Sequence, residues 1–474
     1  MESVERYRER IVSGSIVRTL LWLGFPLMIV QLVQISYNIA DAFWLSRYSD
    51  IAMAIPRQAW PPIMFFSAIS MALSTANLAL ISQYVGAKEF KAASKVASKY
   101  FTASIILGSI LGATYIALRP VIFTYVMRVP SEIYDDVIAY AGVIAIDVTL
   151  SYIVLAYSTI LQGVGDTRRP ALVNVLSALM NIVLDPLLIL GIEPFPRLGA
   201  IGAAVATVLS RVFSVVALFL IIERFYPELK VKLTRDIGID WVLTNLKIGT
   251  PILILIFSNS IAKMVQLRLV NIFGVAVATA YSIGFVVMDL ADATLRGLSR
   301  ASAIMVGQNI GAGLKGRARK IALKTSAVIF MSTAAGALVV YLLRDYLIWV
   351  FTQDPTIYAE AKRFLEVFIW TLPFFGMMIN AMFIGRGSGH TLPPSLIGIA
   401  RLWGFWVATG YFLALYMGYG PLGIWVGMAV SNIFAGTAAL LWLKYGKWTI
   451  PVIRKGMAVK GRMDRGFMKP QPMS

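Results

Sequence analysis

The chain has no cysteine and a single histidine, His390. A disulfide framework and a cysteine-ligated metal site are therefore excluded, and a histidine-ligated metal cluster has too few ligands. Charge is also scarce, because Asp, Glu, Lys and Arg make up 14% of the 474 residues, against about 25% in soluble domains. These absences leave little material for a thiol-dependent enzyme or a metalloenzyme.

What the chain has in excess is apolar surface. Hydrophobic residues make up 58% of the sequence and the mean hydropathy is +0.75. A soluble core of this length could not bury so many apolar side chains, so lipid must cover them. Residues 1–15 are polar and contain no signal-peptide core, and we expect insertion to begin with the first hydrophobic helix.

The net charge of +19 does not indicate nucleic-acid binding. Most of the 43 Lys and Arg residues lie near the N-terminus, in the connections after every second apolar segment, and in residues 445–474. Cytoplasmic connections of membrane proteins carry this excess of positive charge. The pattern predicts a multi-pass protein of the plasma membrane with both termini in the cytoplasm.

Twelve apolar segments are long enough to cross a bilayer with some tilt. They lie near residues 16–46, 53–84, 97–118, 133–162, 170–191, 199–222, 240–273, 275–309, 319–342, 358–385, 394–417 and 421–443. Because backbone polar groups find no water in lipid, these segments must be helices. The predicted fold is an all-α polytopic membrane protein.

The sequence also repeats itself with an offset of 225 or 224 residues. Gly24-Phe25-Pro26 recurs as Gly249-Thr250-Pro251, Gln83-x-x-Gly86-Ala87 as Gln308-x-x-Gly311-Ala312, Gly163-x-Gly165-Asp166-Thr167 as Gly387-x-Gly389-His390-Thr391, and Leu198-Gly199 as Leu422-Gly423. Six helices separate the copies, so both have the same orientation in the membrane. A binding site is expected between or within two such parallel repeats.

This repeat predicts the domain organisation. Residues 1–15 form a cytoplasmic N-terminus and residues 16–222 form an N-lobe of helices 1–6. Residues 223–239 form a cytoplasmic linker, and residues 240–444 form a C-lobe of helices 7–12. Residues 445–474 are basic and rich in Gly, Pro and Met, a composition typical of a disordered cytoplasmic tail.

The chain resembles the multidrug and toxic compound extrusion (MATE) family over nearly all of residues 10–445. The resemblance rests on the two Gln-x-x-Gly-Ala motifs, the Gly-x-Gly-Asp-Thr motif, Tyr37-Asn38-x-x-Asp41 and Asn181-x-x-x-Asp185-Pro186. It implies a V-shaped, monomeric exporter that needs no cofactor. It also implies exchange of organic cations or amphipathic compounds for H⁺ or Na⁺. The Asp41 and Asp185 pattern is similar to the DinF-like and archaeal branch.

Polar side chains inside the apolar segments indicate where coupling takes place. Asp41 and Asp185 are the candidate cation-coupling residues, because a carboxylate facing lipid is costly. The polar residues that we expect to share their cavity, and to support coupling or contact substrate, are Gln34, Tyr37, Asn38, Asn77, Tyr140, Asp147, Asn181 and Thr207. A stripe of polar residues can also serve only to hold helices together.

The sequence is compatible with either H⁺ or Na⁺ as the coupling ion at this site. A carboxyl group removed from water binds a proton more readily, and more so beside a second carboxylate. Alternatively, Asp41, Asp185 and Asn181 could ligate Na⁺ with oxygen atoms, as hard cations require. Pro26 removes one hydrogen bond from the first helix and predicts a bend there. Ion binding at Asp41 would then change the bend.

The C-lobe has a different pattern. Lys263, Asp289, Asp292 and Arg296 form a predicted polar network, in which Asp289, Asp292 and Arg296 share one helix face. The network is either an internal set of salt bridges or a polar wall of the central cleft.

Two other functions are weighed against export of small molecules. A lipid-linked saccharide flippase of the same superfamily would have a basic cavity, which a cavity charge map would reveal. An intramembrane aspartyl protease would need two carboxyl groups sharing one proton. The repeat places Gln266 and Thr409 opposite Asp41 and Asp185, so we expect a transporter and no enzyme. Its partners are small molecules and membrane lipids.

Overall fold

The structure is a computed structural model that describes residues 2–49 and 51–453. Within these ranges it leaves out the side chains of residues 2, 3, 287, 289–291, 293 and 294. The regular elements of the described residues are helices. Long apolar runs without water partners for the backbone fold in this way.

The first copy of the repeat follows a short amphipathic helix, α1 (Glu2–Ser13). Its helices are α2 (Ile16–Tyr48), α3 (Ala54–Gly86), α4 (Phe90–Val121) continued by η1 (Ile122–Val126), α5 (Ser131–Val164), α6 (Arg168–Leu190) and α7 (Ala200–Phe225). Residues 226–238 connect them to the second copy.

The second copy contains more interruptions. Its helices are α8 (Ile239–Asn271), α9 (Val275–Gly311), α10 (Lys315–Phe351), α11 (Pro355–Phe368) with η2 (Ile369–Thr371) and α12 (Leu372–Ser388), α13 (Leu392–Ala400) with η3 (Arg401–Val407), α14 (Ala408–Tyr411) and η4 (Phe412–Tyr416), and α15 (Pro421–Tyr445). The pairs α11–α12 and α13–η4 each run through one apolar segment of the sequence.

Eleven continuous helical stretches of the described chain are long and apolar enough to cross a membrane. The remaining predicted segment, the eighth in chain order, is α9, which is 37 residues long and carries Asp292, Arg296 and Arg300. Of its described part Val275–Val286 is apolar, and the full length of α9 is ample to cross a bilayer. The prediction of an all-α protein with two six-helix lobes is confirmed.

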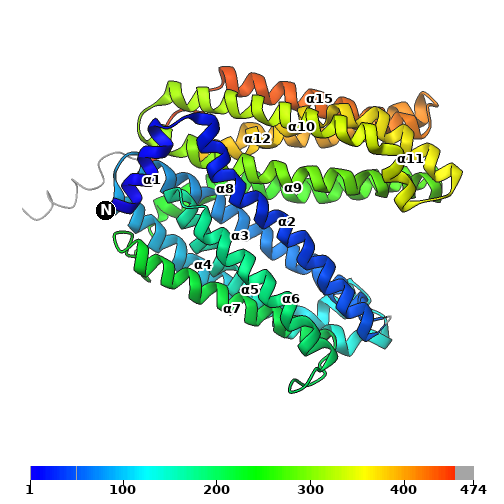
Figure 1. The fold of residues 1–474 in the computed structure, drawn as a ribbon, viewed down its shortest axis with the longest axis horizontal. Helices are drawn as coiled ribbons and strands as arrows, with labels where there is room; N and C mark the ends of the chain where they lie inside the picture. Colours follow the sequence, from blue (N-terminus) through cyan, green and yellow to red (C-terminus); the bar gives the residue numbers. More distant parts are fainter. Residues whose placement is uncertain (1, 50, 454–474) are drawn as a thin grey trace, which may run out of the picture.

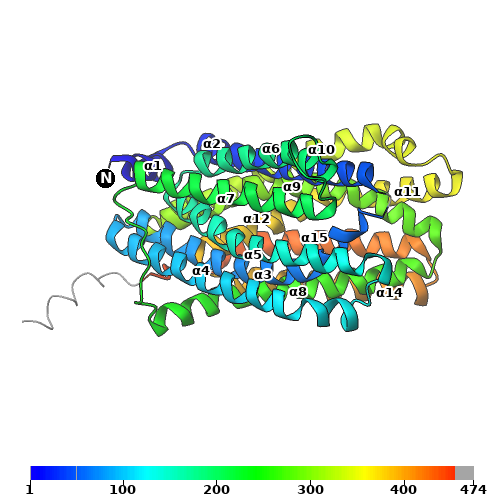
Figure 2. The same cartoon turned by 90° about the horizontal axis from the view of Figure 1, so that it is seen from below.

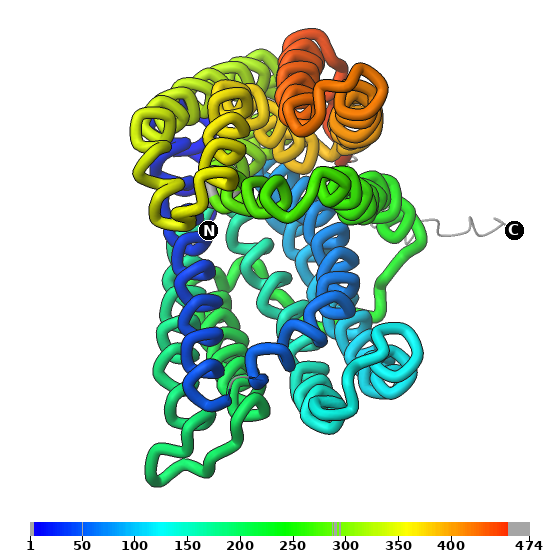
Figure 3. The backbone as a smooth tube through the Cα atoms, turned by 90° about the vertical axis from the view of Figure 1, so that its right-hand side faces the viewer, coloured from blue at the N-terminus to red at the C-terminus, as the bar shows by residue number. Residues whose placement is uncertain are grey.

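The two lobes diverge from one end of the molecule (Figure 1). At that end lies α1, and we call it the closed end; α11 lies at the opposite, open end. Figure 2 shows the helices running lengthwise between the two ends, and Figure 3, viewed from the open end, shows the C-lobe beside the N-lobe. Across the boundary, α2 packs on α9 and α3 packs on α8 and α9.

The recurring motifs meet at the closed end. Gly86 of the N-lobe packs against the backbone of Gln308, and Gly311 of the C-lobe packs against the backbone of Gln83. A side chain at either glycine would overlap a carbonyl group of the other lobe. Glycine therefore permits the close approach of the two backbones that seals this end.

The tail prediction is wrong for the first residues after α15. Trp448 is 1% exposed, and its Nε1 donates to the carbonyl oxygen of Leu443 at 3.1 Å. The Val452 N–H donates to Oε1 of Gln83 at 2.9 Å. Residues 446–453 therefore fold back onto the closed end, because Trp448 and Ile453 bury apolar surface that composition alone averages out. Residues 454–474 lie outside the described part of the chain.

Candidate functional site

Asp41 on α2 and Asp185 on α6 come together inside the N-lobe. The two helices pack against each other along their length. Asp185 is 0% exposed and Asp41 is half-buried. The charge of Asp41 acts electrostatically on Asp185. Two like charges held together away from water are costly unless one is neutralised, and a bound cation would do this.

A short network of polar groups surrounds Asp185. The Asn181 amide, one helical turn before it, satisfies both of its neighbours in one orientation. In that orientation its nitrogen donates to Oδ2 of Asp185 at 3.1 Å, and its oxygen accepts from the Thr207 N–H at 3.2 Å. The Tyr37 hydroxyl lies 3.4 Å from the Thr207 hydroxyl. The other Asp185 oxygen, Oδ1, has no hydrogen-bond partner among the described residues.

Asp147 lies beside this network but has its own counterion. Its Oδ1 accepts from Nε of Arg211 on α7 at 2.8 Å, and its Oδ2 accepts from Ser151 at 3.1 Å. Tyr140, two turns before Asp147 on α5, is buried where the charges of both Asp41 and Asp147 act on its hydroxyl. Arg211 and Asp147 are 64 residues apart in the sequence, so only the folded structure shows that they are partners.

Three of the expected cavity residues differ from the group around Asp185 in their burial or their partners. Gln34 and Asn38 are exposed on α2 rather than enclosed with Asp185. Asn77 is fully buried, but its Nδ2 donates to Oδ1 of Asn245 at 2.7 Å, across the boundary to the C-lobe. Asn77 therefore pairs with the C-lobe, whereas the cavity roles of Gln34 and Asn38 stay predictions. Helical spacing puts them on a polar stripe without specifying which neighbour that stripe faces.

Pro26 lies within α2, which continues without interruption from Ile16 to Tyr48. It is therefore in the same helix as Asp41, about four turns away.

The described part of the C-lobe network is a single ion pair. Nε of Arg296 donates to Oδ2 of Asp292 at 2.7 Å, four residues apart on α9. The Lys263 ammonium lies 5.7 Å from the centre of the Phe285 ring. The side chain of Asp289 lies outside the described residues. Asp292, Arg296 and Lys263 all line a cavity, so they form a polar wall as well as an ion pair.

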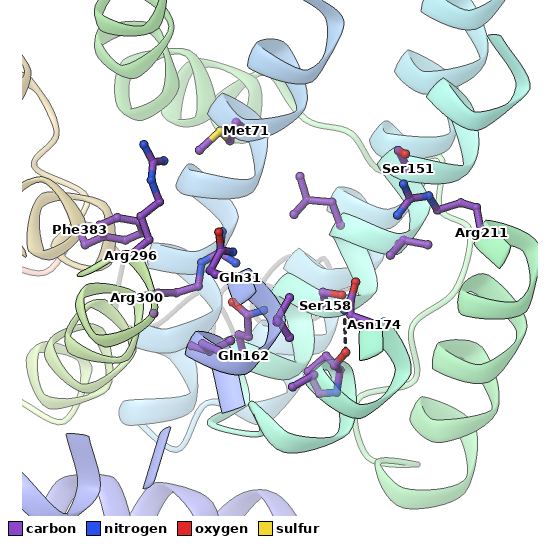
Figure 4. Close-up of a pocket in the computed structure, with 17 residues that line it drawn as sticks. Gln31, Met71, Ser151, Ser158, Gln162, Asn174, Arg211, Arg296, Arg300 and Phe383 are labelled. Atoms are coloured by element: carbon purple, nitrogen blue, oxygen red, sulfur yellow. Dashed lines mark hydrogen bonds between the residues drawn. The ribbon is translucent and has the colours of Figure 1, made fainter. Parts of the chain in front are cut away.

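Two adjoining cavities lie between the lobes. The smaller, of about 280 Å³, is lined by Gln31, Gln162, Asn174, Arg296 and Arg300, among others (Figure 4). The larger, of about 760 Å³, is lined mainly by aromatic and Met side chains of α3, α8, α9, α12 and η3. Met71, Arg296 and Phe383 line both cavities, so the two are parts of one cleft.

The fold and this cleft define a polytopic membrane protein with two six-helix lobes around a shared central space. The MatE family model matches residues 26–187 and 251–412, once in each lobe. The chain therefore belongs to the MatE family of membrane transporters, which are not enzymes.

Individual relatives agree with this assignment. The probable multidrug resistance protein NorM of Thermotoga maritima is 30% identical over 439 residues, covering 91% of this chain and 93% of that protein. The FAD transporter of Shewanella oneidensis is 26% identical, covering 91% of this chain and 95% of that protein. A crystal structure of MATE in the bent conformation has the same fold, with a TM-score of 0.84 and 23% identity, covering 92% of this chain and 96% of that one.

Proposed function

We propose that the chain is a secondary active multidrug exporter. It exchanges amphipathic compounds, organic cations among them, for H⁺ or Na⁺ by alternating access. Asp41 and Asp185 bind the coupling ion. The observation that carries the proposal is this pair of carboxylates: the charge of half-buried Asp41 acts on fully buried Asp185, and neither forms an ion pair with a described cation. An added H⁺ or Na⁺ would supply the missing positive charge.

The surroundings suit either ion. With H⁺, a protonated Asp185 has the unpartnered Oδ1 available to carry the proton. With Na⁺, the carboxylates of Asp41 and Asp185 offer the hard oxygen ligands that such an ion prefers, and the Asn181 amide would turn its oxygen toward the ion in place of its hydrogen bond to Asp185. In both cases neutralisation removes repulsion between α2 and α6. The helix that carries Pro26 and Asp41 would then shift and change the space between the lobes.

We further propose that the closed end faces the cytoplasm of the cell. It carries the connections after α3, α5, α7, α9 and α12, where the positive charge concentrates. The open end then faces outward, and this conformation would release substrate. The cleft between the lobes would hold the substrate before it leaves.

The names of the relatives support small amphipathic molecules as substrates, because several are called multidrug resistance proteins and one an FAD transporter. A lipid-linked saccharide flippase is the alternative. The observation that favours it is the positive charge of the cleft, since Lys263, Arg296, Arg386 and Arg401 line the larger cavity with Asp292 as the described carboxylate.

Transport in proteoliposomes tests the coupling. Export of a fluorescent amphiphile is followed while a pH gradient and a Na⁺ gradient are imposed separately. One gradient should drive export by the parent protein. Asp41→Asn should abolish gradient-driven export, since it cannot carry the ion, while the protein remains folded. Asp136→Asn, at an exposed position near the start of α5, is the control and should transport normally.

Two results would contradict the proposal. Full gradient-driven export by Asp41→Asn would remove the coupling role of that residue. Movement of a lipid-linked saccharide across the bilayer, without transport of the fluorescent amphiphile, would favour the flippase.

A further inference from the structure

The central cleft contains more arginine than its acidic residues neutralise. Arg386 on α12 and Arg401 at the start of η3 both line the larger cavity, while Arg300 on α9 lines the smaller one. Among the described side chains, none of these three guanidinium groups has a carboxylate oxygen within 4 Å. The ion pair at this place is Arg296–Asp292, which uses the described carboxylate of the cavity wall.

Much of the hydrogen-bonding capacity of Arg386 and Arg401 is also unused. The Nε atoms of Arg386 and Arg401 are buried and have no partner among the described residues. Arg401 donates once, from a terminal nitrogen to Oδ1 of Asn432 at 3.1 Å. A guanidinium group has five N–H donors, and burying them without acceptors costs free energy. The cleft thus presents a set of donors for which the protein supplies few acceptors.

The electrostatic surroundings point the same way. The charged groups that act on Arg386 are those of Arg296 and Arg300, which carry the same sign. The charge of Asp292, which is already paired with Arg296, acts on Arg401. Figure 4 shows Arg296 and Arg300 on neighbouring turns of α9, with Phe383 of α12 beside them. Repulsion between close like charges in a protein interior is relieved by an ion of opposite charge. Water alone would supply acceptors but would not neutralise the charge.

The rest of the larger cavity is apolar. Phe257, Phe285, Phe375, Met378 and Met382 contribute to its wall. Aromatic and Met side chains adapt to varied apolar ligands. A molecule that satisfies both parts of the cleft carries a negative group at one end and an aromatic or aliphatic body at the other.

We propose that the cleft binds amphipathic anions, with a carboxylate, sulfonate or phosphate held by Arg300, Arg386 and Arg401 and the apolar body resting on the aromatic and Met wall. This inference rests on the proposed export function and adds amphipathic anions to its substrates. The site belongs to the C-lobe side of the cleft and is separate from the carboxylates of the N-lobe. Bidentate geometry makes Arg the side chain best suited to such oxyanions.

Binding of one fluorophore in three charge states tests this directly. Dansylglycine is an anion, dansylamide is neutral and dansylcadaverine is a cation, so the apolar body is nearly constant. Each is titrated into the purified, detergent-solubilised protein without any ion gradient. The anion should bind about tenfold more tightly than the neutral compound, because a charge-assisted hydrogen bond contributes about that much to affinity. The cation should bind most weakly.

Variants locate the site. Arg386→Gln and Arg300→Gln should each weaken dansylglycine binding by about tenfold and leave dansylamide binding nearly unchanged. Arg386→Glu should reverse the preference toward dansylcadaverine. The matched control is Arg363→Gln, at a side chain that is 58% exposed and lines neither cavity. It should bind all three compounds as the parent does.

The outcomes separate this inference from the coupling proposal. Equal binding of the three compounds, or undiminished dansylglycine binding by Arg386→Gln and Arg300→Gln together, would overturn the anion site, whatever the Asp41→Asn transport assay shows. Selective anion binding lost in these variants would support it even if Asp41→Asn exports normally. Thermal unfolding of each variant establishes that it is folded, and Arg401→Gln replaces any variant that is not.

Discussion

Gln83 and Gln308 make the same contact in opposite directions across the two lobes. Nε2 of Gln83 donates to the carbonyl oxygens of Gly387 at 3.4 Å and Ser388 at 3.0 Å. Nε2 of Gln308 donates to those of Gly163 at 3.0 Å and Val164 at 2.9 Å. Each glutamine of one repeat therefore holds the Gly-x-Gly loop of the other repeat. All of these groups are buried at the closed end.

This reciprocal contact predicts that the glutamines stabilise closure. Gln308→Leu removes two buried hydrogen bonds and leaves two carbonyl groups without donors, which should cost about 1–3 kcal/mol. Because a change of about 1.4 kcal/mol shifts a two-state population tenfold, the closed end should open in a larger fraction of molecules. Gln83→Leu should act in the same direction.

The absence of cysteine makes the measurement simple. Cysteines introduced at Lys95 and Lys320, which are exposed on α4 and α10 near the closed end, carry spin labels for distance measurement. Gln308→Leu should add a population at longer distance. Gln353→Leu, an exposed residue near α11, serves as the control. An unchanged distance distribution in both Gln83→Leu and Gln308→Leu would show that these bonds do not govern closure.

Gly86 and Gly311 should be intolerant of any side chain in the closed conformation. A Cβ at Gly86 would overlap the Gln308 carbonyl, and one at Gly311 would overlap the Gln83 carbonyl. Backbone groups cannot rotate away as side chains do, so the lobes must separate. We expect Gly311→Ala to lengthen the same spin-label distance and to slow transport strongly.

Gly316→Ala is the matched control for this prediction. No heavy atom lies within 4 Å of its added Cβ, and Gly316 lies at the start of α10, close in sequence to Gly311 at the end of α9. It should leave both the distance and the transport rate unchanged. If Gly311→Ala closes and transports as the parent does, the tight packing described here is not required for the cycle.

The Asp147–Arg211 pair should stabilise the N-lobe as a unit. Their side chains are 13% and 31% exposed, so removing one partner leaves a poorly solvated charge. Asp147→Asn and Arg211→Gln should each lower the free energy of unfolding by about 1–3 kcal/mol, less than for a fully buried pair. The double variant should lose less than the sum of the two, because neither charge is left alone.

Thermal and denaturant unfolding in detergent measures this coupling. Asp236→Asn provides the comparison, since its 3.2 Å bridge to Lys99 has a carboxylate that is 72% exposed and should contribute about 1 kcal/mol or less. Strictly additive effects at Asp147 and Arg211 would mean that the two charges do not depend on each other.

The sequence predicts where the helices lie better than it predicts which helices pack against one another. Each of the twelve apolar segments corresponds to a long helical stretch, because lipid leaves the backbone no alternative. The ends lie several residues outside the predicted bounds in α4 and α10, where polar residues extend the helix beyond the apolar run. Apolarity marks the part of a helix that lies in lipid, and hydrogen bonding continues past it.

In the candidate site, too, the sequence predicts some residues and leaves the partners of others undetermined. Asp41 and Asp185 could be selected because a charged group inside an apolar segment is expensive wherever it points. Asn77 could not be placed, because a neutral amide is equally satisfied in a cavity or by Asn245 of the other lobe. The excess of arginine in the cleft was also hidden, since Arg386 and Arg401 are distant from Arg300 along the chain.

The sequence by itself therefore determined that lipid surrounds this protein, where its helices lie, that it contains two copies of one repeat, and which charged residues lie inside apolar segments. Composition, length and repetition are properties of a chain before it folds. Only the tertiary structure decided the partners: Arg211 for Asp147, one Gly-x-Gly loop for each glutamine, and no described carboxylate within 4 Å of Arg300, Arg386 or Arg401. Helical periodicity fixes which side of a helix is polar, but which helix that side meets depends on how all the helices pack together.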